Sequence, residues 1–181
     1  MSLNAPHSPF NVPKEYYELY ENESDLLESQ KRFYGMITNI DDNFGRLHQH
    51  VENLGILDNT IIIFTTDNGT SNGYKYSRKD KKWLGFNAGM RGTKTSEYDG
   101  GHRVPFIIKW KKGGLFGGHN YSGLSAHVDM LPTLLSFAKI AFNFTKKIDG
   151  ADLSKHVMNK SEADRMLSLI HISEPTRPVP I

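Results

Sequence analysis

The run from Thr60 to Thr66 constrains the fold more than any other stretch of this chain. Its sequence, TIIIFTT, is β-branched or aromatic throughout and does not alternate between polar and apolar residues. Such a run predicts a strand covered on both faces, as in the parallel sheets of layered α/β proteins. Asp67, Asn68 and Gly69 follow directly. A carboxylate and a carboxamide at a strand end fit either an Asx turn or two oxygen ligands for Ca²⁺ or Mg²⁺.

Two predicted helices accompany this strand. Apolar residues recur at spacings of three and four from Leu26 to Leu54, which predicts a long amphipathic helix that stops at Gly55. Residues 125–140 predict a second helix, with Asp129 as its N-cap or first-turn acid and Pro132 close to its start.

A second strand and a long loop complete the pattern. Residues 103–110, RVPFIIKW, predict a strand with Pro105 near its start. Residues 67–93 are polar and glycine-rich and predict a loop of the length often used for function. The order helix, strand, loop, strand, helix predicts an α/β layered fold.

The composition narrows the range of functions. The 181 residues include 22 basic and 20 acidic ones, for a net charge of +2, which gives no general argument for nucleic acid or an anionic membrane as partner. No apolar stretch approaches the roughly 20 residues of a membrane span. The chain has no cysteine, so disulfide and thiolate chemistry are excluded.

Several side chains in the loops are candidates for binding an anion. Lys94 lies between glycines and could hold a phosphate or sulfate, although taken alone such a lysine is more often a solvated surface residue. His7 lies in the proline-flanked segment NAPHSPF, where a rigid loop could present its ring, although a lone loop histidine is more often simply exposed. His102 is a similar case. Arg103 could instead pair with Glu97 or Asp99 and only hold the loop.

Together and in this order, the motifs carry a family resemblance. The matching stretches are NAPHSPFNVP, YGMITNIDDNFGRL, LGILDNTIIIFTTDNGT, FNAGMRGTKTSEYDGGHRVPFIIKW, AHVDMLPTLL and IDGADL. Over about residues 3–167 the chain resembles the C-terminal part of the catalytic domain of type I sulfatases, in the alkaline-phosphatase-like superfamily. The resemblance implies an α/β fold, as a fragment of a mixed, largely parallel sheet flanked by helices.

The resemblance also implies roles for individual residues. Asp67 and Asn68 match two metal ligands, normally for Ca²⁺, with Mg²⁺ as the alternative. Lys94 matches a sulfate-binding lysine, and His7 matches a histidine that lines the sulfate site. His102 and Arg103 lie in the loop beside them. The implied substrate is a sulfated small molecule or sulfated carbohydrate, and the family's usual location is periplasmic or secreted.

One departure from the family pattern concerns the nucleophile. In the family this is a formylglycine made from Cys or Ser in a Cys/Ser-x-Pro-x-Arg motif, and it is expected to lie N-terminal to this chain, together with a further pair of aspartates. The expectation is therefore a partial catalytic domain over residues 1–167 that is inactive alone. Residues 168–181, SLIHISEPTRPVPI, do not match and are expected to be a disordered terminus or an artefact.

The expected function is hydrolysis of a sulfate ester. Two alternatives remain open from sequence. One is a phosphodiesterase or phosphonate hydrolase of the same superfamily, and the other is a module that binds sulfated glycans without turnover.

Overall fold

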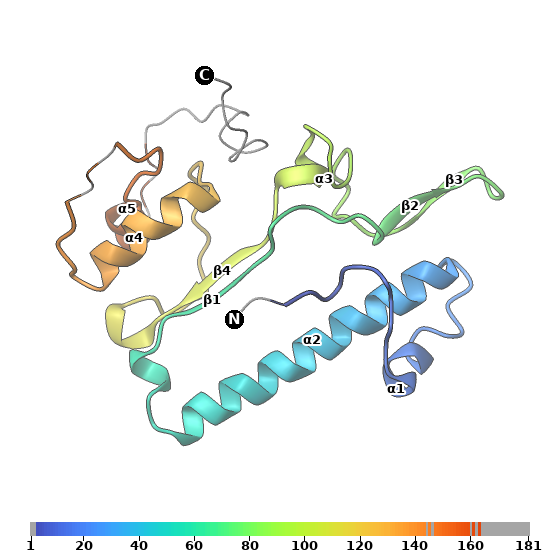
Figure 1. The fold of residues 1–181 in the computed structure, drawn as a ribbon, viewed down its shortest axis with the longest axis horizontal. Helices are drawn as coiled ribbons and strands as arrows, with labels where there is room; N and C mark the ends of the chain where they lie inside the picture. Colours follow the sequence, from blue (N-terminus) through green and yellow to red (C-terminus); the bar gives the residue numbers. More distant parts are fainter. Residues whose placement is uncertain (1–2, 144, 146, 160, 162, 164–181) are drawn as a thin grey trace. The chain divides into compact units, whose positions relative to one another are not determined.

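The computed structural model describes residues 3–143, 145, 147–159, 161 and 163. The chain divides into two compact units: unit 1 comprises Met1–Asp58 and Thr65–Pro105, and unit 2 comprises Asn59–Phe64 and Phe106–Ile181. Figure 1 labels the elements, which are α1 (Lys14–Glu18), α2 (Glu28–Asn53), η1 (Leu57–Asn59), β1 (Ile62–Thr65), β2 (Tyr74–Ser77), β3 (Lys82–Gly85), α3 (Asp99–His102), β4 (Phe106–Lys109), η2 (Lys111–Gly113), η3 (His127–Asp129), α4 (Met130–Phe137) and α5 (Ser154–Asn159).

Helix α2 is the long amphipathic helix that the apolar spacing predicts. At its end Gly55 adopts a φ of 70°, and its N–H donates to the Glu52 carbonyl oxygen at 2.8 Å. The N–H of Ile56 donates to the Val51 carbonyl oxygen at 3.4 Å. These two bonds form a Schellman motif, in which glycine takes the left-handed position without a steric penalty. The predicted stop at Gly55 is confirmed.

An antiparallel hairpin follows β1, where the sequence predicts only a loop. Strands β2 and β3 pair with Tyr76 opposite Trp83, and Lys81 turns the chain with a φ of 52°. The prediction of a loop over residues 67–93 is therefore wrong for both strands. YKYS does alternate aromatic and polar residues, as a strand exposed on one face should. The lysines and arginine around it made the segment resemble a solvated loop.

The hairpin is fastened to the first turns of α2. The side chain of Gln30, fully buried, accepts from the Leu27 N–H at 2.9 Å and donates to the Leu84 carbonyl oxygen at 3.0 Å. The Tyr34 hydroxyl donates to the Gly73 carbonyl oxygen and accepts from the Phe86 N–H at 3.0 Å. Burial raises the pKa of Tyr34, which keeps this hydroxyl protonated as a donor. These bonds connect the two chain segments at the open end of the hairpin to one face of helix α2.

Unit 2 contains β4 and the first three residues of β1, the two strands predicted from the apolar runs. Strands β1 and β4 are hydrogen-bonded neighbours, and Figure 1 shows them side by side and running in opposite directions. Pro105 directly precedes β4, in agreement with its predicted place. Strand β1 is half-buried along its whole length, without alternation. The predicted order of helix, strand, strand and helix is confirmed, but neither strand pairing among the described residues is parallel.

Asp129 is the N-cap residue of α4 by position, as predicted, but its carboxylate bonds elsewhere. One oxygen accepts from the Ala126 N–H at 2.7 Å, and the other accepts from the Ala151 N–H at 2.9 Å. The residue is only 3% exposed. Asp129 therefore ties the segment near residue 150 to the start of α4, and Pro132 lies in the first turn of that helix.

Replacing Asp129 with alanine is expected to lower the free energy of unfolding of unit 2 by about 2–4 kcal/mol, because two buried N–H groups lose their acceptors. Urea denaturation followed by Trp110 fluorescence would measure this, in a Trp83→Phe background, because Trp83 and Trp110 are the only tryptophans. Asp129→Asn, which retains one acceptor, should lose less. An alanine variant as stable as the parent would contradict the assignment.

Candidate functional site

The polar residues after β1 lie in a bend rather than in regular structure. Asp67 is exposed and Asn68 is half-buried, one and two residues after Thr66. The Thr66 hydroxyl donates to the Asn68 carbonyl oxygen at 3.2 Å. This local bond leaves the Asp67 carboxylate on the surface, where it can meet a ligand.

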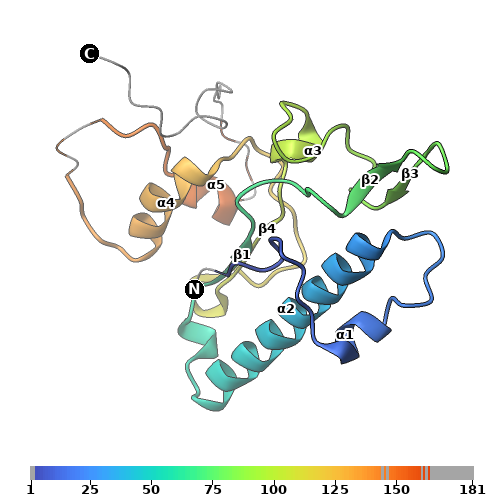
Figure 2. The same cartoon turned by 45° about the vertical axis from the view of Figure 1, so that its right-hand side comes forward.

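Backbone hydrogen bonds join this bend to the loop that contains Lys94. The Gly69 N–H donates to the Gly101 carbonyl oxygen at 2.8 Å, and the Lys94 N–H donates to the Thr70 carbonyl oxygen at 2.9 Å. A side chain on Gly69 would collide with the Gly100 carbonyl oxygen. Figures 1 and 2 both show the stretch after β1 passing beside the loop that leads into α3. The two motifs singled out from the sequence are therefore neighbours in unit 1.

The Lys94 loop is itself tightly folded. The Gly100 N–H donates to the Arg91 carbonyl oxygen at 2.8 Å, and a side chain on Gly100 would collide with the carbonyl of Gly92. The Gly100-Gly101 pair is therefore packed closely against neighbouring backbone. Thr95, next to half-buried Lys94, has a φ of 74°. A β-branched residue in that region is strained, and such strain clusters at functional loops.

Two features of this loop have no clear signal in the sequence. The Arg91 guanidinium lies 3.6 Å from the centre of the Tyr98 ring, which braces the loop by a cation–π contact. Asn87, 7% exposed, donates from Nδ2 to the Met90 carbonyl oxygen at 2.6 Å. Both residue types are common in ordinary loops, so only the three-dimensional contacts identify them.

His102 and Arg103 both make contacts within the loop. A ring nitrogen of His102 lies 2.9 Å from the Glu97 carbonyl oxygen. Arg103 pairs with Asp99 at 3.5 Å, and both side chains are more than half exposed. The sequence left open that Arg103 only holds the loop by pairing with Glu97 or Asp99, and the structure shows the pair with Asp99. An exposed pair of this kind contributes little to stability, so Arg103 could still exchange its partner for an anion.

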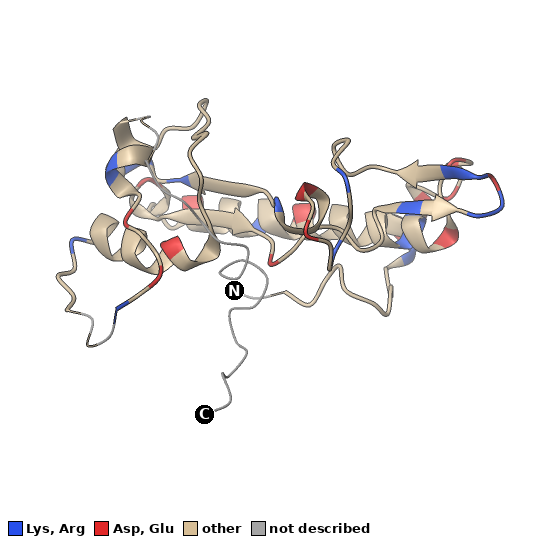
Figure 3. Cartoon of the chain, turned by 90° about the horizontal axis from the view of Figure 1, so that it is seen from above, with Lys and Arg blue, Asp and Glu red and all other residues tan. Residues whose placement is uncertain are grey.

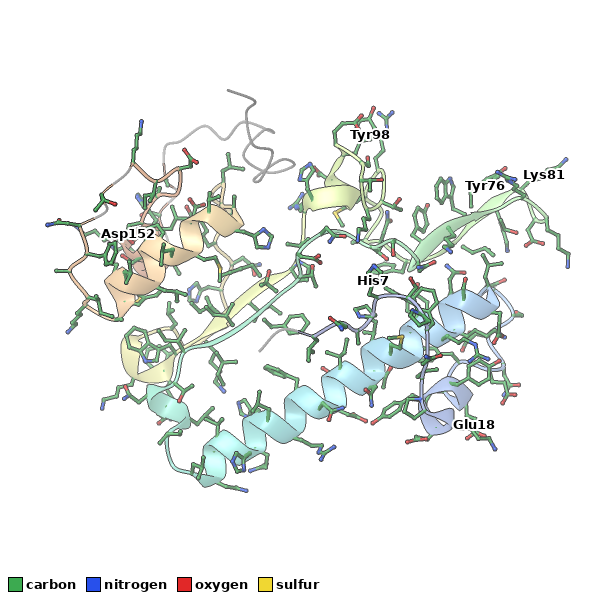
Figure 4. The ribbon with its side chains drawn as sticks, in the orientation of Figure 1. His7, Glu18, Tyr76, Lys81, Tyr98 and Asp152 are labelled. Atoms are coloured by element: carbon green, nitrogen blue, oxygen red, sulfur yellow. The ribbon has the colours of Figure 1, made fainter. Side chains whose placement is uncertain are left out.

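His7 lies on the N-terminal segment, near α2 in Figure 4. Its ring Nδ1 is 2.8 Å from the Ser8 carbonyl oxygen, and its backbone N–H donates to the Asn4 carbonyl oxygen at 2.8 Å. Phe10 anchors this segment to α2 by an edge-on contact with Phe33, with ring centroids 6.1 Å apart. The imidazole is exposed and held by short-range bonds, and its place beside Asp67 and Lys94 stays a prediction.

The candidate metal ligands are of the right chemical type for Ca²⁺ or Mg²⁺, but there are too few of them. Asp67 and Asn68 offer hard oxygen ligands, which suit Ca²⁺ or Mg²⁺. Within the described part of the chain, no three His, Asp or Glu side chains gather in a group that could hold a metal. Two oxygens fall short of the roughly six to eight ligands of Ca²⁺.

Also among the described residues, no helix is long and apolar enough to span a membrane.

One stretch of this chain does have the form of the nucleophile motif, which the resemblance places N-terminal to the chain. Residues 173–177 read SEPTR, which has the form Ser-x-Pro-x-Arg. They lie outside the described residues. The motif follows the Lys94 loop in the chain, whereas the resemblance implies a position that precedes it.

Comparisons with known proteins agree with the motifs. A family model described as Sulfatase matches residues 1–140. The uncharacterized sulfatase YdeN of Escherichia coli (strain K12) is 29% identical over 175 residues, which cover 96% of this chain and 29% of the relative. The ulvan-active sulfatase of Formosa agariphila is 27% identical over 193 residues, which cover 96% of this chain and 34% of the relative.

Two solved structures also match this chain. The crystal structure of Ps i-CgsB matches with a TM-score of 0.74 and 25% identity over 88% of this chain and 33% of that chain. Its complex with k-i-k-neocarrahexaose matches with a TM-score of 0.71 and 25% identity, over 87% and 32% of the two chains. The chain thus spans about a third of the length of these relatives.

Proposed function

Because this chain belongs to the sulfatase family, we propose that its unit 1 binds the sulfate group of a sulfate ester, and its metal ion, as part of a sulfuric ester hydrolase. The alkaline-phosphatase-like fold predicted from sequence is confirmed by the structural matches. One observation carries the proposal. The bonds from Gly69 to Gly101 and from Lys94 to Thr70 hold an oxygen-donor bend beside a cationic loop.

Each candidate side chain has a role that follows from its chemistry. Lys94 binds a sulfate oxygen and neutralises the negative charge of the sulfate group in the transition state. His7 donates a proton to the departing alcohol oxygen, which is the role of a general acid. His102 and Arg103 add hydrogen-bond donors at the edge of the site.

Asp67 and Asn68 would hold the metal ion with their side-chain oxygens. When bound, a divalent cation withdraws electron density from the sulfate oxygens and so favours cleavage. The attacking group is not among the residues proposed here, so their part in the reaction is binding, charge stabilisation and, for His7, proton donation to the leaving group.

The substrate class proposed is a sulfated carbohydrate. One relative is named as ulvan-active, and one structural match was solved in complex with k-i-k-neocarrahexaose. The exposed position of Asp67 supports this choice, because a site at the surface can take one sulfate of a large molecule.

The proposal is tested by binding of 4-nitrocatechol sulfate with and without CaCl₂. We expect Ca²⁺ alone to bind no tighter than about millimolar, because only two protein oxygens are available. Millimolar CaCl₂ should strengthen binding of the sulfate ester, and Asp67→Ala should abolish that gain. Isothermal titration calorimetry measures both affinities.

Asp41→Ala is the matched control, because Asp41 is an exposed carboxylate on α2. It should leave both affinities unchanged. The proposed metal site would be refuted if the affinity for the sulfate ester did not change with CaCl₂, or if both variants changed it equally.

A further inference from the structure

The outer face of the β2–β3 hairpin carries three aromatic rings in contact. Tyr74 stacks on Trp83 with centroids 4.7 Å apart and planes 12° from parallel. Tyr76, directly opposite Trp83, meets it edge-on at 5.7 Å. Tyr76 is 49% exposed and Trp83 is 53% exposed. The three rings therefore form an exposed surface, the aromatic face, defined by Tyr74, Tyr76 and Trp83.

The aromatic face is not part of the hydrophobic core. Side chains alternate along a strand, so Leu84 and Ser77 point to the opposite face, where they are 6% and 4% exposed. Helix α2 contacts the same strand through Gln30, which donates to the Leu84 carbonyl oxygen. The solvent side of a hairpin is ordinarily polar. An exposed cluster of aromatic rings on that side is typical of a surface that binds a ligand or another macromolecule.

The turn of the same hairpin is strongly cationic. Residues 78–82 read RKDKK, with four cations and one carboxylate. Asp80 is engaged within the turn, where it accepts from the Ser77 hydroxyl at 2.6 Å. Figure 3 shows the positive colour concentrated at this turn.

Most of these cations are available to a ligand. Lys82 lies 3.4 Å from Asp25, in a pair whose side chains are both more than half exposed. Arg78, Lys79 and Lys81 are exposed and form no ion pair within the described ranges. Figure 4 shows Lys81 at the hairpin tip, with Tyr76 on the neighbouring strand. A ligand that reaches from the aromatic face to the turn would meet rings first and cations next.

We propose that the aromatic face and the basic turn bind the sugar chain of a sulfated polysaccharide, at a site separate from the Asp67–Lys94 loops. The C–H groups of a pyranose ring pack on the electron-rich face of Tyr or Trp. Sulfate groups on the same chain pair with Arg78, Lys79 and Lys81. This inference rests on the proposed function, since it assigns to the sulfatase a second contact with its own substrate.

Single-stranded nucleic acid is a second kind of polymer that could bind here, because it combines bases that stack on aromatic side chains with a negatively charged backbone. The sulfated sugar is favoured because the sulfate-ester loops lie in the same unit as the hairpin. A second contact of this kind would raise affinity for the polymer and leave affinity for a single sulfate group unchanged.

Affinity electrophoresis of the 181-residue chain tests the proposal, in gels that contain ι-carrageenan, dextran sulfate or neutral dextran. The sulfated polymers should retard the protein and dextran should not. Tyr76→Ala combined with Trp83→Ala should weaken retention by ι-carrageenan at least about tenfold. Lys79→Gln combined with Lys81→Gln should weaken retention by both sulfated polymers. Neither pair should change the affinity for 4-nitrocatechol sulfate by more than about twofold.

Matched controls separate these effects from general loss of charge or fold. Phe116→Ala removes an aromatic residue that is 72% exposed in unit 2, and Lys14→Gln with Lys112→Gln removes two other cations. Both should leave retention unchanged. The lysine pair in the turn does not touch the hairpin pairing, so it tests the proposal even if the aromatic pair unfolds. In a Trp110→Phe background, quenching of Trp83 fluorescence by ι-carrageenan reports contact directly.

Four results would overturn the proposal: no retention by either sulfated polymer, retention unchanged in both hairpin pairs, equal loss in the controls, or tighter binding of oligo(dT) than of ι-carrageenan. Failure of the proposed function has a different signature. There, Asp67→Ala would leave binding of 4-nitrocatechol sulfate intact while the hairpin variants still lost retention.

Discussion

Replacing Lys94 with alanine is expected to weaken binding of 4-nitrocatechol sulfate by about ten- to hundredfold. A hydrogen bond to a charged group contributes about 1.5–3 kcal/mol, and about 1.4 kcal/mol corresponds to a factor of ten in affinity. The bond that ties Lys94 to Thr70 comes from the backbone N–H, so the alanine variant retains it. The loss should therefore reflect the missing ammonium and not a displaced loop.

Calorimetry in millimolar CaCl₂ measures this change. Lys14→Ala is the control, because the Lys14 side chain is 85% exposed and lies on α1. Lys94→Arg should recover part of the affinity, since it restores the charge with a different geometry. Equal affinities in the parent and Lys94→Ala would remove Lys94 from the site and leave the loop with a structural role only.

Replacing Gly69 with alanine should separate the two loops of the candidate site. The added methyl group would collide with the Gly100 carbonyl oxygen, and backbone atoms cannot rotate away as a side chain can. Overpacking in a close contact typically costs about 1–3 kcal/mol. Here the strain falls on the hydrogen bonds that join the two loops, so we expect the bend to separate from the Lys94 loop.

Hydrogen exchange detects that separation. The amides of Gly69 and Lys94 donate across the two loops and should lose protection in Gly69→Ala. Gly45→Ala is the control, because a methyl group there meets nothing within 4 Å on α2. It should stabilise the helix slightly, by about 0.5–1 kcal/mol. Unchanged protection at Lys94 in Gly69→Ala would show that the loops do not depend on this contact.

Local sequence patterns were sufficient for the larger elements. Helix α2 has enough apolar positions at helical spacing, and a glycine at its end, to define both its face and its stop. Strands β1 and β4 are apolar runs bounded by polar or proline residues. In each case the signal lies within the element itself, so no long-range information is needed.

The remaining features depend on contacts between distant segments. Nothing near Gly69 indicates that it will pack on Gly100, since that contact forms only after the two loops meet. The hairpin was missed because its lysines and arginine obscured the alternation of Tyr74, Tyr76 and Trp83. The role of Asp129 was only partly predicted, because its partner Ala151 comes from a later segment. The direction of β4 relative to β1 likewise depends on the path of the chain between them.

The two units are interleaved along the chain, since residues 59–64 belong to unit 2 but lie between the two parts of unit 1. During synthesis, β1 is complete before residues 66–105 are made, and only then does its partner β4 appear. At roughly 5–20 residues per second this interval is on the order of seconds. In engineering terms, a truncation after Pro105 retains all of unit 1 but leaves β1 without β4. Neither unit can be isolated as one continuous stretch of chain, so separating them requires splicing out residues 59–64.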